Sequence, residues 1–113
     1  METVISGQLF EWDDEKAKKN KIKHNVSFKT ATAVFDDPNR IEEYDYLHSW
    51  NEERWQVTGM AGDILFVIYT ERKESIRLIS ARKATEKERI RYYGNNSILL
   101  SENGNASDSG GES

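Results

Sequence analysis

The chain has 113 residues, of which 36% are hydrophobic and 32% are charged, so its composition predicts one globular soluble domain. It has no cysteine, which excludes disulfides and thiolate metal sites, and its two histidines are too few for a histidine-rich metal site, so we expect neither a metal nor another cofactor. No apolar run has the length of a membrane span and no signal segment opens the chain, so we expect a cytoplasmic protein without a membrane partner.

The net charge of −4 conceals an uneven distribution of charge. Residues 16–35 hold six lysines and no acid, residues 36–63 hold eight acids against two arginines, and residues 71–91 hold eight cations against four acids. Affinity for phosphate follows the local potential, so the basic blocks are candidates for a nucleic-acid surface. The competing interpretation is that they are ordinary solvated helix faces.

The N-terminal part predicts a short strand followed by a helix. Residues 1–8 give no clear signal and are expected to be frayed, whereas residues 9–12 alternate apolar and polar positions as a half-buried strand does. Asp13 or Asp14 can cap a lysine-rich helix over residues 14–24, which has only a narrow apolar stripe and is expected at the surface.

A second helix is predicted over residues 28–36. Asn25 is a suitable left-handed stop for the first helix, and Ser27 is a suitable N-cap for the second. The second helix is expected to end before Pro38, because proline disfavours a helical conformation in the residue before it.

From Arg40 onward the apolar period changes to two, which indicates β-structure. Short polar turns separate the runs, so consecutive hairpins are expected to build a four-stranded antiparallel meander. Residues 64–70 are apolar on both faces and are predicted to form its central strand. The four strands are expected at residues 41–47, 54–60, 64–70 and 75–81.

The last predicted element is a short helix that begins at Thr85, where Glu88 completes a capping box. The chain then becomes rich in Gly, Asn and Ser, a composition that buries too little apolar surface to fold. We therefore predict an α+β domain over residues 1–94 and a disordered tail over residues 95–113.

Several side chains could move protons or bind phosphate. His24 and His48 are candidates for proton transfer, because histidine is the side chain best suited to give and take a proton near neutral pH, although a histidine at a helix end or in a turn is as often structural. Glu53 is a candidate base, while Arg77 and Arg82 lie in and beside a predicted core strand, where an arginine needs a partner. These groups suit metal-free RNA cleavage without singling it out. Trp50 in a polar turn is the more exposed of the tryptophans that could stack on bases.

The assembled motifs resemble the BrnT family of toxins. The resemblance covers about residues 9–93 and depends on Phe10-Glu11-Trp12-Asp13, Lys23-His24 followed by Val26-Ser27-Phe28, and Ile76-Arg77-Leu78-Ile79-Ser80-Ala81-Arg82 followed by Ala84-Thr85 and Glu88-Arg89.

The resemblance implies a RelE-like fold with two N-terminal helices, an antiparallel sheet and a C-terminal helix. It also implies a ribonuclease toxin of a type II toxin–antitoxin system that cuts RNA and inhibits translation. A BrnA-type ribbon-helix-helix antitoxin would neutralise it, and the chain would reach operator DNA only through that antitoxin. By position, Lys23, His24, His48, Glu53, Arg77 and Arg82 fall on motif positions of the family. The expected catalytic residues are His24, His48, Glu53, Arg77 and Arg82. The expected RNA-binding residues also draw on the basic blocks and the aromatic side chains, and are Lys16, Lys19, Lys23, Lys83 and Tyr92.

Two alternatives remain open from the sequence. One is a non-enzymatic subunit that binds the antitoxin and contributes to repression of its own operon. The other is a small module that binds RNA without cleaving it.

Overall fold

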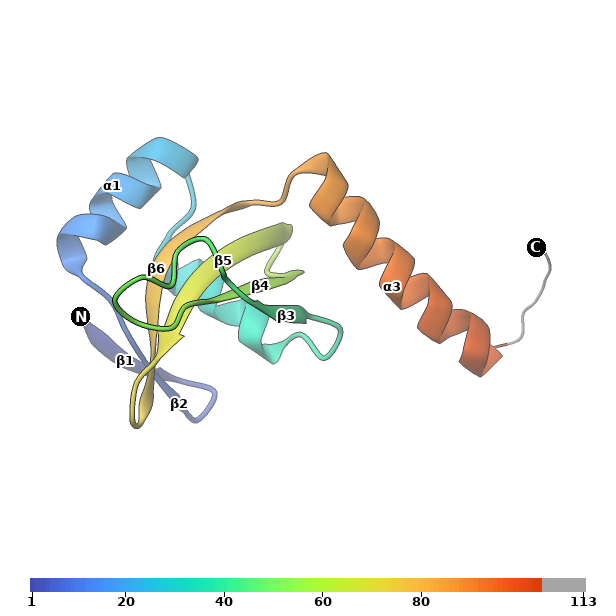
Figure 1. Cartoon of the computed structure of the whole chain (residues 1–113), viewed down its shortest axis with the longest axis horizontal. Coiled ribbons are helices and arrows are strands. Elements are labelled where there is room, and N and C mark those ends of the chain that lie inside the picture. Colours follow the sequence, from blue (N-terminus) through green and yellow to red (C-terminus); the bar gives the residue numbers. More distant parts are fainter. Residues whose placement is uncertain (105–113) are drawn as a thin grey trace.

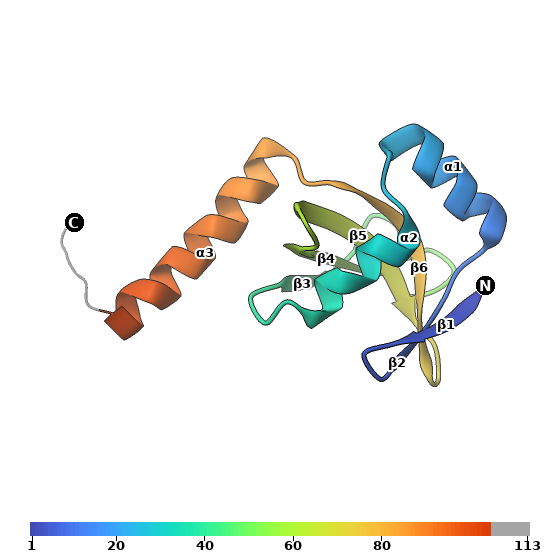
Figure 2. The ribbon, with the colours of Figure 1, turned by 180° about the vertical axis from the view of Figure 1, so that it is seen from behind.

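The computed structural model describes the backbone of residues 1–104 and the side chains of residues 1–95. A mixed six-stranded sheet in the order β1-β2-β6-β5-β4-β3 forms its centre, with α1 at one end and α3 projecting from the other (Figure 1). Helix α2 and the 3₁₀ helix η1 pack against one face of this sheet (Figure 2). The elements are β1 (Glu2–Ile5), β2 (Gln8–Glu11), α1 (Asp14–His24), α2 (Phe28–Ala31), η1 (Thr32–Asp36), β3 (Ile41–Tyr44), β4 (Trp55–Met60), β5 (Ile64–Glu71), β6 (Ser75–Lys83) and α3 (Glu86–Gly104).

The N-terminal hairpin corrects two predictions. Strand β1 pairs antiparallel with β2, and β2 pairs in parallel with β6, so the N-terminus is not frayed and the sheet is neither four-stranded nor wholly antiparallel. The turn is Ser6-Gly7, with φ of 53° and 81°, and positive φ at both positions is the signature of a two-residue hairpin. The parallel pairing joins segments far apart in sequence, which local patterns do not reveal.

The predicted meander is present as β3 to β6. All three of its pairings are antiparallel, and the last contains a register shift between Ile68 and Tyr69. Leu65, Val67 and Tyr69 of β5 are buried on the face toward η1, whereas Phe66 and Ile68 on the other face are only half-buried. The expected central strand thus lies between β6 and β4, and α2 and η1 pack on the face opposite Phe66 and Ile68.

The core fills the space between the sheet and the α2–η1 segment. The predicted single helix over residues 28–36 is one α-helical turn that tightens into η1. Its buried Val34 packs so closely on β4 that a Cβ on Gly59 would lie 3.2 Å from both Val34 Cβ and Val34 O. Glycine at position 59 thus lets the segment approach the strand.

Helix α1 is fixed along the free edge of β6 by one buried side chain. Asn20 Nδ2 donates to Ala81 O at 2.8 Å and to Val26 O at 2.9 Å, while Ala81 N donates to Asn20 Oδ1 at 3.1 Å. The amide thus makes the two bonds that a neighbouring strand would make, beyond the point where β2 ends. The caps are as predicted, since Asp13 accepts from Lys16 N and Asn25 has φ of 58°.

Helix α3 begins with the predicted capping box, in which Glu88 N donates to Thr85 Oγ1 and Thr85 N donates to Glu88 Oε1. It is not short, because it continues to Gly104 and includes the first part of the segment predicted to be a disordered tail. The rest of that predicted tail, residues 105–113, lies outside the described residues. Within residues 1–104, no helix combines the length and hydropathy required to cross a membrane.

Candidate functional site

The face of the sheet away from η1 carries a hollow of about 370 Å³. Because side chains alternate along a strand, the same face receives Phe66 and Ile68 from β5, and Ser80 and Arg82 from β6. The loop before β4 and the first turns of α3 close its rim. The lining residues are Leu47, His48, Gln56, Thr58, Phe66, Ile68, Ser80, Arg82, Glu88 and Arg91.

His48 is held at this rim by a buried carboxylate. The Asp45 side chain is 0% exposed, and its Oδ1 accepts from Leu47 N and His48 N, while its Oδ2 lies 2.8 Å from His48 Nδ1. Since a carboxylate only accepts, Nδ1–H donates and Nε2 is left to take up a proton. The His48 side chain is 50% exposed, so this nitrogen is accessible to a bound substrate.

Arg82 lies in the same hollow and is held in three ways. Its guanidinium carbon is 4.2 Å from the centre of the Phe66 ring, and its Nη1 and Nη2 donate to Glu88 Oε1 and Oε2 at 2.8 and 3.0 Å. Nη1 also donates to Lys83 O. Burial opposes ionisation of Glu88, but the bonds from Arg82 and from Thr85 N–H lower the pKa of this carboxyl below its ordinary value. The bidentate geometry is the one that arginine also uses for a phosphate.

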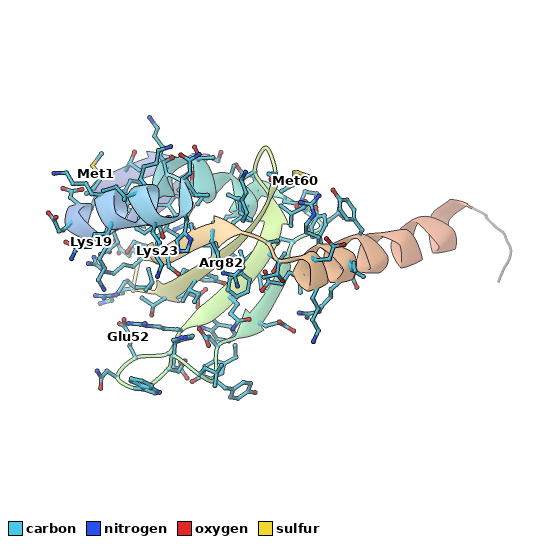
Figure 3. All side chains as sticks on the ribbon, turned by 90° about the horizontal axis from the view of Figure 1, so that it is seen from above. Met1, Lys19, Lys23, Glu52, Met60 and Arg82 are labelled. Carbon is cyan, nitrogen blue, oxygen red and sulfur yellow. The ribbon has the colours of Figure 1, made fainter. Side chains whose placement is uncertain are left out.

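A second hollow of about 210 Å³ lies between α1 and β6 and shares Ser80 with the first. Its lining residues from α1 recur at helical spacing on one face, namely Lys16, Lys19, Asn20, Lys23 and His24. Figure 3 shows Lys19, Lys23 and Arg82 following one another across the molecule. The two hollows therefore form a continuous surface, with lysines at one end and with His48 and Arg82 at the other.

Two of the expected catalytic residues do not join this surface. Arg77 lies at the far end of β6, where its Nη1 donates to Glu11 Oε1 at 2.7 Å, across the parallel pairing with β2. The bonds from Ser75 and then from Arg77 lower the pKa of Glu11. Glu53 lines a separate hollow beside Arg72, and only its backbone oxygen is used, as the acceptor for Thr70 Oγ1.

Two of the expected RNA-binding residues are also displaced. Tyr92 is only 4% exposed and its hydroxyl donates to Asp37 Oδ2 at 2.5 Å, so its ring is built into the fold and is not presented to a base. Lys83 is exposed at the end of β6 and lines neither hollow, because it points to the opposite face from Arg82.

Sequence reasoning missed Asp45 and Ser80 as parts of the site. The Asp-x-x-His spacing from Asp45 to His48 was a usable signal, because a carboxylate that accepts from the backbone two and three residues on forms a tight turn. Around this turn, Tyr46 and Trp50 are 83% and 85% exposed. Within the described side chains, no three potential ligands from His, Asp or Glu come together as a metal site.

Comparisons with known proteins identify the family of this chain. The family model described as "Ribonuclease toxin, BrnT, of type II toxin-antitoxin system" matches residues 12–88. No curated protein matches the chain. A crystal structure of the Brucella abortus ribonuclease toxin BrnT is similar in fold, with a TM-score of 0.53 and 21% identity over 68% of this chain and 96% of the other. The family match covers more than half of the chain, so this protein belongs to the BrnT family of ribonuclease toxins of type II toxin–antitoxin systems.

Proposed function

We propose that this protein is an endoribonuclease that cleaves RNA without a metal ion, with His48 as the general base and Arg82 as the phosphate ligand. The observation that carries the proposal is the buried Asp45 carboxylate, which fixes His48 at the rim of the hollow that also holds Arg82. A carboxylate that orients an imidazole through Nδ1 is a recurrent way to prepare Nε2 for proton transfer.

The proposed reaction is attack by the ribose 2′ oxygen on the adjacent phosphorus. His48 Nε2 takes the 2′-hydroxyl proton as the new O–P bond forms, and the bond from phosphorus to the 5′ oxygen breaks. The departing 5′ oxygen takes a proton from solvent, which reaches this open hollow. The products are a 2′,3′-cyclic phosphate and a 5′-hydroxyl. Negative charge on the phosphoryl oxygens is greatest in the transition state, and an arginine beside them therefore stabilises that state most.

Arg82 is prepared for that task by its neighbours. The Glu88 carboxylate now fills the two hydrogen-bonding positions that two phosphate oxygens would take. Contact with the Phe66 ring holds the guanidinium over the sheet when the carboxylate is replaced by substrate. We therefore expect RNA to compete with Glu88 for Arg82.

The RNA strand is proposed to run from the lysine-lined hollow, past Ser80, to Arg82. Lys16, Lys19 and Lys23 on one face of α1 supply contacts to phosphates. Trp50, exposed two residues beyond His48, offers a ring on which an unpaired base can stack. The exposed ring favours single-stranded RNA, whose bases are free to stack.

Family membership supports the biological part of the proposal. A toxin of this family acts on RNA and has an antitoxin as its partner. We propose that cleavage inhibits translation in the cytoplasm and that a BrnA-type ribbon-helix-helix antitoxin neutralises the toxin. Operator DNA would then be contacted through the antitoxin.

The test is cleavage of a labelled single-stranded RNA by the purified chain in excess EDTA. We expect cleavage with 2′,3′-cyclic phosphate ends, and growth arrest when the chain is expressed alone. Cleavage that disappears with EDTA would overturn the metal-free mechanism. Binding of RNA without cleavage, together with harmless expression of the folded chain, would support a non-enzymatic binding subunit instead.

A further inference from the structure

A separate cavity of about 290 Å³ lies on the helix-covered side of the sheet, between the β1–β2 hairpin, η1 and strands β3, β5 and β6. Alternation along β5 puts Tyr69 and Glu71 here, on the opposite face from Phe66 and Ile68. The site assigned to RNA uses none of the cavity's lining residues, which are Ile5, Ser6, Gln8, Phe10, Phe35, Asp36, Arg40, Glu42, Tyr69, Glu71 and Ile76.

The walls of this cavity carry an excess of negative charge. Arg40 is its lining cation, and Arg40 Nε already donates to Glu42 Oε2 at 2.5 Å, while Tyr69 donates to Glu42 Oε1 at 2.9 Å. The bond to Asp36 comes from the neutral Ser6 hydroxyl at 3.0 Å. Among the described residues, Asp36 and Glu71 therefore line the cavity without an ion pair to a cation.

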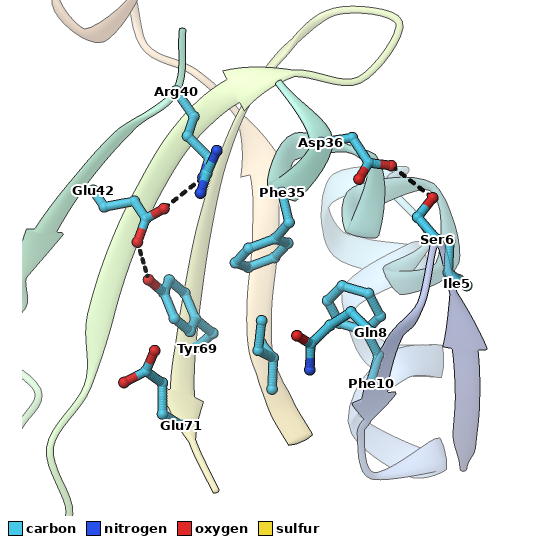
Figure 4. Close-up of a pocket in the computed structure, with 11 residues that line it drawn as sticks. Ile5, Ser6, Gln8, Phe10, Phe35, Asp36, Arg40, Glu42, Tyr69 and Glu71 are labelled. Carbon is cyan, nitrogen blue, oxygen red and sulfur yellow. Dashed lines mark hydrogen bonds and ion pairs between the residues drawn. The ribbon is translucent and has the colours of Figure 1, made fainter. Parts of the chain in front are cut away.

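An aromatic ring lies between these carboxylates. Figure 4 shows Phe35 between the wall that carries Glu42 and Glu71 and the wall that carries Asp36. The Phe35 ring is half-buried. Its centroid lies 5.4 Å from that of the Phe10 ring and 5.0 Å from that of the Tyr69 ring, which it meets edge-on, so Phe35 is held in place. An aromatic ring flanked by carboxylates is an environment that receives a guanidinium group, which stacks on the ring while the carboxylates attract its charge.

The size of the cavity decides what kind of ligand fits. Pockets for drug-sized ligands begin at about 300 Å³, so this cavity is at the lower limit and suits a single side chain better than a nucleotide. The excess of carboxylates also disfavours a phosphate.

We propose that this cavity is a docking site for an arginine side chain presented by a protein partner. The guanidinium lies against Phe35, where the charges of Asp36 and Glu71, which have no ion pair to a described cation, attract it. Because the cavity and the RNA surface lie on opposite faces of the sheet, a partner held here leaves the surface containing His48 and Arg82 open. The inference does not depend on the proposed cleavage reaction, because its test reads binding alone.

The experiment is an NMR titration of the full chain with the blocked peptide acetyl-Gly-Arg-Gly-amide. The same peptide with citrulline is a neutral control of almost the same shape. We expect shifts at Phe35, Tyr69 and their neighbours with the arginine peptide, and about tenfold weaker binding with the citrulline peptide.

The double variant Asp36→Asn/Glu71→Gln keeps the shape of the cavity and removes its unpaired charge. It should bind the arginine peptide about tenfold more weakly, whereas the matched control Glu2→Gln/Glu15→Gln, with both changes outside the cavity, should bind as the unchanged chain does. Equal binding by both double variants, or shifts confined to the surface around His48, would overturn the proposal. The proposal would also be overturned if RNA binding were weakened in the cavity variant and unchanged in the control variant.

Discussion

The two hollows on the open face of the sheet hold one histidine each, and they differ in what holds that histidine. His48 is bonded to a fully buried carboxylate and shares its hollow with Arg82. His24 ends α1 among lysines and shares its hollow with three of them. An imidazole aimed by a buried acid is suited to proton transfer, whereas an imidazole beside several ammonium groups adds to a phosphate-binding surface. We therefore propose chemistry in the first hollow and RNA binding in the second.

The largest expected effect on RNA cleavage is at His48. His48→Ala should lower the rate constant for RNA cleavage by about 100- to 10,000-fold, because it removes the general base. His24→Ala is the matched control and should change that rate by less than about threefold. Single-turnover cleavage of a labelled RNA measures both. If His24→Ala proves the more damaging variant, the assignment of the two hollows is reversed.

Arg82→Ala should come next, with a loss of about 100-fold in the same rate constant, because a charged donor to the phosphate is removed. Arg82→Lys should recover only part of this, since lysine cannot make the bidentate contact or stack in the same way on Phe66. Circular dichroism is needed as a control, because Arg82 also bonds to Glu88. A well-folded Arg82→Ala variant with normal cleavage would remove Arg82 from the mechanism.

Changes to the lysines of α1 should weaken RNA binding and leave the rate of the cleavage step nearly unchanged. The triple variant Lys16→Ala/Lys19→Ala/Lys23→Ala should weaken RNA binding and reduce the slope of log K against log salt by about 2, while leaving the rate at saturating enzyme nearly unchanged. The matched control is Lys18→Ala/Lys21→Ala on the same helix, since neither residue lines the hollow. Fluorescence anisotropy at several salt concentrations provides the measurement, and equal salt slopes for both variants would contradict the account.

The smallest effect on activity is expected for Arg77→Ala, because Arg77 lies outside both hollows. It should instead cost about 1 kcal/mol of folding free energy at neutral pH through loss of the ion pair to Glu11. Since the bonds from Ser75 and from Arg77 lower the pKa of Glu11 below 4.5, their stabilisation is present above that pH and is lost as the pH falls further. Urea unfolding of both proteins should therefore give a difference that shrinks on acidification. A difference that grows in acid would contradict this role.

Comparing the predicted elements with the structure shows how much of the fold the sequence could predict. Local signals predicted the helix over residues 14–24, the Ser27 and Thr85 caps and the meander, because caps and alternation act between near neighbours. The parallel pairing of β2 with β6 was missed because it depends on contacts across the whole chain.

The site shows the same limit. His48, Arg82 and the lysines of α1 were chosen by residue type and by resemblance to the family, and the fold brings them to one surface. Arg77 and Glu53 were chosen on the same grounds, yet the fold separates them from His48, because Arg77 is on the same strand as Arg82 but at its opposite end. Position along a strand therefore matters as much as the face on which a residue lies.

The central claim is that the His48 imidazole takes the proton from the attacking hydroxyl, and chemical rescue tests it most directly. Single-turnover RNA cleavage by His48→Ala should be measured with increasing free imidazole, with Arg82→Ala as the control. The account predicts that imidazole raises the rate of the His48→Ala variant, which leaves an open position at an exposed site, and does not raise that of Arg82→Ala. A His48→Ala variant that cleaves at the unchanged rate, or that imidazole does not rescue although it is folded and binds RNA normally, would contradict the account.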